Sequence, residues 1–186
     1  MDYSILVNKD NPLPRAHIPN NLVPAESNYK EEIYIDKKVK ESFDKLKLDS
    51  IRFGYEIDIV SGYRDYDYQE KIYNKLIDEK GFAYAITRIA KPGASEHQTG
   101  LALDFCVYRE GKSYIEHELE DFVETKWIHQ NAHRYGFILR YPEGKEDITK
   151  YSYEPWHLRY VGSIASYIYN NNLTLEEYYN LREEKI

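Results

Sequence analysis

The stretch 101–107 (Leu-Ala-Leu-Asp-Phe-Cys-Val) constrains the fold most, because large and small side chains alternate along it. In a strand, its large apolar side chains would all lie on one face: Leu101, Leu103, Phe105 and Val107. Asp104 would lie on the other face, between two small residues. A carboxylate inside a strand is costly to bury unless it is paired or binds a cation. The pattern therefore predicts a strand packed on one face, with either a metal ion or an arginine partner at Asp104.

Apolar spacing elsewhere predicts helices and strands around this segment. Helices are expected over 35–48, with Asp36 as N-cap, and over 67–79, 82–90, 116–135, 163–170 and 174–182, of which 116–135 is the longest. Strands are expected over 55–60, 137–141 and 156–161. Four prolines predict an irregular arm over 1–30, packed on the rest. We expect one α+β domain over 1–186, a small antiparallel sheet flanked by helices.

Composition and charge exclude several classes of protein. The net charge is −7, which argues against a nucleic-acid partner because phosphate binding needs a basic surface. No stretch approaches the roughly 20 apolar residues of a membrane span. The first residues lack the basic and apolar regions of a signal peptide, so the sequence as it stands predicts a cytoplasmic protein, or an extracytoplasmic one if an export segment was removed. The single cysteine, Cys106, fits a reducing compartment and is expected to be buried and unreactive.

A second segment with chemical potential is Glu-Pro-Trp-His at 154–157. Glu154 and His157 are three residues apart, and Pro155 between them disfavours a helix interior. A turn leading into a strand would direct both side chains towards one site. His97 lies in a glycine-flanked loop shortly before Asp104, so it can reach the same region.

Two imidazoles and one carboxylate, with a fourth position open, are the ligand set of a catalytic zinc site. We therefore expect His97, Asp104 and His157 to hold one zinc ion per chain. Glu154 would be the base that takes a proton from water and passes it to the leaving amine. Without a metal, Glu154 would be a solvated acid in a proline-containing turn.

Other histidines are weaker candidates. The zinc-protease motif His-Glu-x-x-His is absent, because Asp121 stands where the second histidine would follow His117. His129 and His133 are four residues apart and could chelate a metal on a helix, but no acidic base completes the pair. We expect these two to have structural roles, and we assign none to His17.

Three motifs together resemble the VanY-like D-alanyl-D-alanine carboxypeptidases, a group that includes the bifunctional VanXY enzymes and the L,D-carboxypeptidases. They are Ser-Gly-Tyr-Arg at 61–64, Ser-Glu-His-Gln-Thr-Gly at 95–100 with the aspartate at 104, and Glu-Pro-Trp-His at 154–157. The resemblance covers nearly the whole chain. It implies a fold shared with zinc D,D-peptidases and the hedgehog signalling domain. By the matching motifs it also implies His97, Asp104 and His157 as zinc ligands and Glu154 as the base.

The resemblance also implies roles for residues that the pattern alone would leave open. Arg64 matches the arginine that steadies the carbonyl oxygen as negative charge develops, although a salt bridge is its ordinary interpretation. Gln69 and Ser95 match positions that contact the terminal residue of the substrate. Trp156 would pack in the wall beside it.

The implied activity is removal of the C-terminal D-Ala from peptidoglycan precursors ending in D-Ala-D-Ala, and of free D-Ala-D-Ala if the chain acts like VanXY. That activity would deprive vancomycin-type antibiotics of their target. The alternatives are an L,D-carboxypeptidase that trims tetrapeptides, a phage-type endopeptidase, and a non-catalytic zinc module that binds peptide or wall. Pocket contacts near the penultimate residue of the substrate would separate the D,D activity from the L,D activity. Residues 108–118 lie where relatives vary in length.

Overall fold

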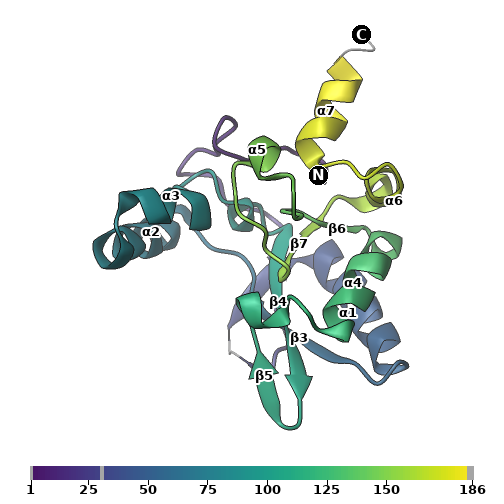
Figure 1. Ribbon diagram of the computed structural model, residues 1–186. Coiled ribbons are helices and arrows are strands. Elements are labelled where there is room, and N and C mark those ends of the chain that lie inside the picture. Colours follow the sequence, from purple (N-terminus) through teal and green to yellow (C-terminus); the bar gives the residue numbers. More distant parts are fainter. Residues whose placement is uncertain (1, 30–31, 184–186) are drawn as a thin grey trace.

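A central antiparallel sheet organises the protein (Figure 1), whose computed structural model describes residues 2–29 and 32–183. Four strands lie in the order β3 (Glu56–Ser61), β4 (Ala102–Arg109), β7 (His157–Tyr160) and β6 (Phe137–Leu139). The short strand β5 (Lys112–Tyr114) pairs with the far end of β4, and a separate two-stranded sheet joins β1 (Leu22–Ala25) to β2 (Ile33–Asp36). The predicted α+β class with an antiparallel sheet is confirmed.

Helices flank this sheet on both sides (Figure 1). The helices in chain order are α1 (Lys37–Ile51), α2 (Tyr66–Lys80), α3 (Phe82–Arg88), α4 (Val123–Asn131), α5 (Glu146–Thr149), α6 (Ala165–Asn170) and α7 (Leu175–Glu183). Asp36 caps α1 as expected, since its Oδ1 accepts the Lys38 N–H at 2.7 Å. Helices α2 and α3 stand apart from α1 and α4, across the strands (Figure 1).

Strand β4 alternates as the sequence predicts. Leu103, Phe105 and Val107 are fully buried in the main core, together with Phe43 and Leu46 of α1. The Asp104 side chain lies on the opposite face and keeps 13% of its exposure. One face of the strand therefore carries the core, and the other carries a carboxylate.

The predicted long helix over 116–135 is wrong. The segment divides into a 3₁₀ turn η2 (Glu116–Leu119), helix α4 and a 3₁₀ turn η3 (Ala132–Tyr135). Phe122 interrupts it with an extended backbone (φ −69°, ψ 138°) while its ring packs against the core and under the Arg109 guanidinium. The apolar pattern is continuous here, but tertiary packing of Phe122 overrides it.

Three short strands depart from the predictions for their segments: β1, β5 and β2, whose Ile35 and Asp36 fall in the predicted helix 35–48. Residues 22–25 were expected within an irregular arm, yet they pair with β2 in the register Leu22 opposite Asp36. Strand β5 was not predicted, because it has only three residues without apolar alternation. It is formed by a two-residue hairpin turn in which Glu110 and Gly111 both have positive φ, at 51° and 77°.

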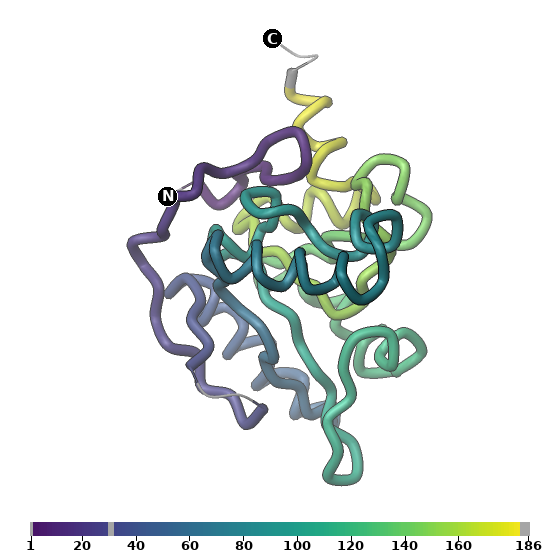
Figure 2. Tube along the Cα trace, turned by 90° about the vertical axis from the view of Figure 1, so that its left-hand side faces the viewer, coloured from purple at the N-terminus to yellow at the C-terminus, as the bar shows by residue number. Residues whose placement is uncertain are grey.

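The start of the arm lies beside the C-terminal helix (Figure 2). The Tyr179 hydroxyl donates to the Ser4 carbonyl at 2.6 Å, and the Asn8 amide donates to Glu176 at 3.1 Å. The two ends of the described chain are therefore packed together.

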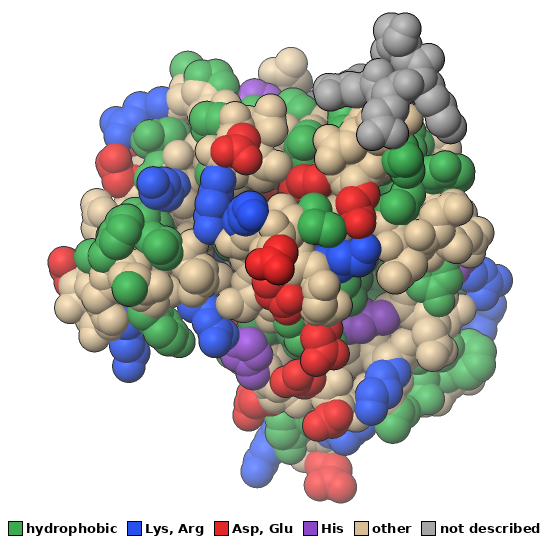
Figure 3. Space-filling view, turned by 45° about the horizontal axis from the view of Figure 1, so that its top comes forward, with side chains coloured by type: hydrophobic (Ala, Val, Ile, Leu, Met, Phe, Trp, Pro, Cys, Tyr) green, Lys and Arg blue, Asp and Glu red, His purple; other side chains and the backbone are tan. Residues whose placement is uncertain are grey.

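On the face shown in Figure 3, Asp and Glu side chains gather near the middle, and Lys and Arg side chains are spread around them. Among the residues that the structure describes, no helix combines the length and the apolar character needed to cross a bilayer.

Gly62 follows β3 at a point where the β1–β2 sheet comes very close. A Cβ at this position would lie 2.4 Å from the Tyr34 carbonyl oxygen and 2.7 Å from Cγ2 of Ile35. We expect Gly62→Ala to lower the free energy of unfolding by about 1–3 kcal/mol, as overpacking does elsewhere. Denaturant unfolding followed by circular dichroism measures this, and an unchanged midpoint would contradict the close approach.

Candidate metal centre and active site

The two central strands place Asp104 and His157 directly opposite each other. Their Cα positions pair in the register between β4 and β7, so their side chains share one face of the sheet. His97 comes from the 3₁₀ turn η1 (Glu96–Thr99), which ends at Gly100 in the left-handed conformation (φ 70°) just before β4. The fold thus brings together residues that are far apart in the sequence.

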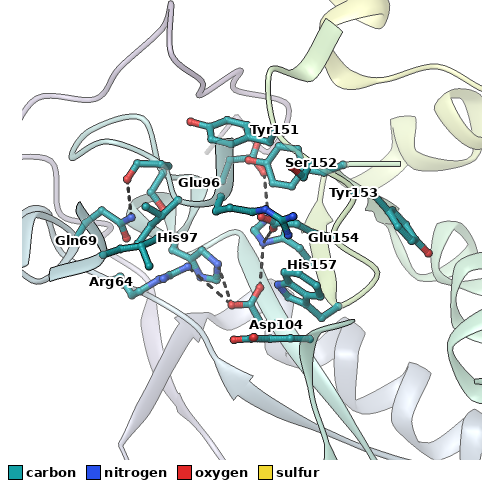
Figure 4. Close-up of a pocket in the computed structure, with 18 of the residues that line it drawn as sticks. Arg64, Gln69, Glu96, His97, Asp104, Tyr151, Ser152, Tyr153, Glu154 and His157 are labelled. Atoms are coloured by element: carbon teal, nitrogen blue, oxygen red, sulfur yellow. Dashed lines mark hydrogen bonds and ion pairs between the residues drawn. The ribbon is translucent and has the colours of Figure 1, made fainter. Parts of the chain in front are cut away.

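The three side chains form a compact cluster (Figure 4). Nδ1 of His157 lies 3.0 Å from Oδ1 of Asp104, and Nε2 of His97 lies 3.3 Å from Oδ2. One potential ligand atom from each residue can be chosen so that all lie within 4.8 Å of one another. Both histidines are almost fully buried, at 2% and 3% exposure, so the cluster is shielded from bulk water.

Each histidine ring has one nitrogen facing Asp104 and the other facing an oxygen acceptor, an arrangement that suits a metal site. Nδ1 of His97 lies 2.6 Å from the Gly62 carbonyl oxygen, so this nitrogen carries the proton and leaves Nε2 facing Asp104. Nε2 of His157 faces Oε2 of Glu96 at 3.6 Å, and its Nδ1 faces Asp104. Metal-binding histidines commonly present one nitrogen to the metal and donate the other N–H to a carbonyl or carboxylate. These residues therefore fit a zinc ion with one open position.

The electrostatics of the cluster also favour a cation. Burial and the nearby Arg64 lower the pKa of His97 to about 4, which keeps this ring neutral, as a ligand must be. Burial opposes ionisation of Asp104, yet the neighbouring imidazoles hold its pKa well below the ordinary value. For His157, burial lowers the pKa, but the Asp104 and Glu96 carboxylates outweigh it and raise the pKa to about 9.

Glu154 reaches this cluster from a tight turn. The His157 N–H donates to the Glu154 carbonyl at 3.2 Å across Pro155 and Trp156, which is the turn that the sequence predicts. Oε2 of Glu154 lies 3.8 Å from Nδ1 of His157. Burial raises the pKa of Glu154 to about 7, the range in which a carboxylate can both accept and return a proton at neutral pH.

Arg64 lies beside the cluster, whereas Trp156 lies beside His117. Nη2 of Arg64 lies 3.8 Å from Oδ2 of Asp104, and its Nε is buried without a hydrogen-bond partner among the described residues. Trp156 packs edge-on against the His117 ring, with centroids 4.9 Å apart. Both side chains line the pocket.

Gln69 and Ser95 lie in the same pocket, nearly fully buried. The Gln69 amide donates to the Ala90 carbonyl at 2.8 Å, which leaves its Oε1 without a partner among the described residues. The whole pocket has a volume of about 330 Å³ and extends between α2, α3 and the loop 151–156. This size is at the lower end for sites that bind small ligands.

Comparison with known proteins identifies the family of this chain. The family model VanY, described as D-alanyl-D-alanine carboxypeptidase, matches residues 32–163, which include all eight of the predicted site residues. The chain belongs to the VanY family.

Two curated relatives of this VanY-family chain are informative. The putative carboxypeptidase YodJ of Bacillus subtilis (strain 168) is 47% identical over 94% of this chain, which spans 66% of YodJ. The bifunctional D-Ala-D-Ala dipeptidase and D-Ala-D-Ala carboxypeptidase VanXYC of Enterococcus gallinarum is 37% identical over 94% of this chain and 92% of its own length.

Solved structures of VanY-like proteins have the same fold. The LdcB LD-carboxypeptidase superposes with a TM-score of 0.87 and 44% identity, over 94% of this chain and 84% of that one. A mutant of the vancomycin-resistance D,D-pentapeptidase VanY, in complex with Zn(II), gives a TM-score of 0.81 and 36% identity, over 96% and 99%.

The weaker candidates for metal binding or reactivity in this VanY-family chain, His129, His133 and Cys106, lie in structural environments. Nε2 of His129 lies 2.8 Å from the Pro155 carbonyl oxygen, so it supports the turn that carries Glu154. His133 stacks on Tyr169 and pairs with the Ser166 hydroxyl at 3.1 Å. Cys106 is buried, and burial raises the pKa of its thiol to about 11.

Sequence reasoning missed Glu96, although it lies inside the second motif. Its carboxylate is 1% exposed and pairs with two buried arginines, Arg140 and Arg159. Both arginines lie within the predicted strands 137–141 and 156–161, but no local pattern shows that they meet Glu96. Sequence reasoning also missed Tyr141, whose ring centroid lies 5.0 Å from that of His157.

Proposed function

We propose that this chain is a zinc-dependent D,D-carboxypeptidase that removes the C-terminal D-Ala from peptidoglycan precursors ending in D-Ala-D-Ala. The observation that carries the proposal is the cluster of His97, Asp104 and His157 with Glu154 at 3.8 Å from one of its rings. Membership of the VanY family and the Zn(II) complex of a VanY structure support the choice of substrate and metal.

The chain's own residues account for the proton transfers. Glu154 takes a proton from the attacking water and delivers it to the leaving amine of the terminal residue. Its pKa near 7 suits both directions of transfer. Zinc held by the three ligands would polarise the scissile carbonyl and lower the pKa of water to near 7.

Arg64, Gln69 and Ser95 have complementary tasks in this proposal. The Arg64 guanidinium stabilises the carbonyl oxygen as negative charge develops on it. Gln69 presents an Oε1 that has no partner within the described part of the chain and can accept an N–H of the substrate. The Ser95 hydroxyl can donate to the terminal carboxylate of the substrate. The Trp156 ring bounds the space for the terminal side chain.

A second candidate is an L,D-carboxypeptidase that removes D-Ala from wall tetrapeptides. The LdcB LD-carboxypeptidase has a TM-score of 0.87 against 0.81 for the VanY complex, with higher identity. Both activities release a terminal D-Ala and use the same catalytic groups, so they differ only in the contacts to the penultimate residue.

The substrate is tested by D-Ala release from three compounds: a muramyl pentapeptide, a muramyl tetrapeptide and free D-Ala-D-Ala. Release from the pentapeptide is the expected result, and additional release from the free dipeptide would extend the activity to that of a dipeptidase. Release from the tetrapeptide alone would replace the D,D assignment with the L,D one. If zinc-loaded protein releases D-Ala from none of them, the chain would instead be a non-catalytic zinc module that binds peptide.

A role in resistance depends on the D,D activity. Removal of the terminal residue destroys the D-Ala-D-Ala group that vancomycin-type antibiotics recognise. We propose that expression of the chain in a sensitive host, in the compartment where the precursor lies, raises the vancomycin concentration needed to stop growth. An equal rise with the Glu154→Ala variant would contradict this role.

Arg64→Ala is expected to lower kcat by about 10²–10³-fold, the cost of losing one preorganised donor to a developing oxyanion. Zinc content should stay near that of the parent, because Arg64 lies 3.8 Å from Asp104 and contributes no ligand atom. Steady-state kinetics with metal analysis checks both. Arg15→Ala is the control, since Arg15 makes exposed ion pairs with Asp67 and Glu70 outside the pocket. Activity of the Arg64 variant equal to that of this control would remove Arg64 from the mechanism.

A further inference from the structure

A buried network of charges lies next to the metal cluster and is centred on Glu96. Oε1 of Glu96 accepts hydrogen bonds from Nε of Arg140 at 2.7 Å and from Nη1 of Arg159 at 2.6 Å. The three residues are 1%, 0% and 0% exposed, so none of these charges reaches solvent.

Stability alone does not explain such a network. Burial of charges carries a desolvation cost, and apolar residues of similar volume in place of a buried ion cluster are often neutral or stabilising. A more specific purpose is suggested by the second oxygen of the carboxylate. Oε2 of Glu96 and Nε2 of His157 lie 3.6 Å apart, both buried, and neither has a hydrogen-bond partner among the described residues.

We infer that Glu96 is a positioning residue for His157. Its Oε2 accepts a hydrogen bond from the Nε2–H of this ring, so that Nδ1 is unprotonated and faces the metal. The inference rests on the proposed zinc site. It assigns Glu96 the part that the Gly62 carbonyl plays for His97, at 2.6 Å from the opposite nitrogen of that ring. Ligating imidazoles are commonly oriented by such acceptors.

The arginines fix the direction in which Oε2 points. Arg159 lies in β7 and also donates to the Tyr3 and Ile5 carbonyls at 3.2 and 2.7 Å. Arg140 follows β6 and donates through Nη1 and Nη2 to Glu176 of α7 at 2.9 and 2.6 Å. Because both guanidiniums are held at their far ends, they fix the position of Oε1, and Oε2 lies 3.6 Å from Nε2 of His157.

Glu96→Gln tests the inference because the side chain keeps its size. The two arginines have only donors, so the amide oxygen of Gln would turn towards them and its NH₂ would face His157. Nε2 of His157 must then accept a hydrogen bond, which places the ring proton on Nδ1, the nitrogen needed by the metal. Zinc affinity should therefore fall about 10–100-fold, the usual cost of losing such an outer partner.

Glu176→Gln is the matched control. It makes the same change of charge in the same network, one arginine further out, and it contacts Arg140 and Asn8 rather than His157. It is expected to lower the unfolding temperature and to keep the zinc affinity of the parent. A purely structural role for Glu96 predicts instead that both variants lose stability and that neither loses zinc affinity.

The experiment is competition for zinc between each folded variant and a chelator of known affinity, with unfolding temperatures measured in parallel. A loss of affinity in Glu96→Gln alone supports the inference, and equal affinity in all three proteins overturns it. If Glu96→Gln does not fold, long-range ¹H–¹⁵N spectra of the zinc-loaded parent decide: Nε2–H on His157 supports the inference, and Nδ1–H overturns it. A parent that binds no zinc would refute the proposed function itself.

Discussion

Replacement of Glu154 by alanine is expected to lower kcat for D-Ala release by about 10²–10⁴-fold, the contribution of a positioned general base. Zinc should remain at the level of the parent, because the three potential ligand atoms belong to other residues. The basis of this prediction is that Glu154 lines the pocket, with its Oε2 3.8 Å from Nδ1 of His157. Stopped-time assays of D-Ala, with zinc measured on the same sample, give both quantities.

Glu143→Ala provides the control for this variant. Glu143 is an exposed acid nearby in the sequence that does not line the pocket, so its loss should change neither zinc content nor turnover. Full activity in the Glu154 variant would exclude Glu154 as the base. Loss of zinc together with activity would instead make Glu154 a ligand.

Replacement of Asp104 by alanine is expected to remove both the metal and the activity. Asp104 lies between the two imidazoles, at 3.0 and 3.3 Å, so its loss leaves two neutral ligands without the negative charge of the set. Loss of a residue that only hydrogen-bonds a metal ligand lowers metal affinity about 10–100-fold. Loss of Asp104, a ligand itself, should lower zinc affinity by more than that. Zinc occupancy after dialysis against a weak chelator measures the effect, and His97→Ala should behave alike.

Asp58→Ala separates this effect from the loss of any buried acid. Asp58 lies on the neighbouring strand β3, 1% exposed, and pairs with Lys47 at 2.9 Å. Its replacement should lower stability and keep one zinc per folded chain. If Asp104→Ala keeps zinc and full activity, the ligand assignment is wrong.

Local patterns predicted the parts of this site that depend on neighbouring residues. Alternation along 101–107 placed the carboxylate of Asp104 opposite the core face, and the proline at 155 indicated the turn that directs Glu154 and His157 to one place. Both inferences used only the geometry of a strand or a turn. The specific combination of three motifs then identified the family.

Features that depend on distant contacts were not predictable in the same way. Glu96 meets Arg140 and Arg159 across 44 and 63 residues of chain, so no local pattern reveals the network. The break at Phe122 arises because its ring packs against the core and Arg109, while the apolar spacing on either side continues. The short hairpin after β4 depends on positive φ at Glu110 and Gly111 rather than on alternation.

The central claim is that one zinc ion at His97, Asp104 and His157 is needed for release of a terminal D-Ala. Titration of zinc into metal-free protein, with D-Ala release from the muramyl pentapeptide and tetrapeptide measured at each step, tests it most directly. We predict that activity on one of these peptides rises to a plateau at one zinc per chain and that Asp104→Ala stays inactive throughout. Activity that is independent of added zinc, or an Asp104→Ala variant that follows the same titration curve, would contradict the account.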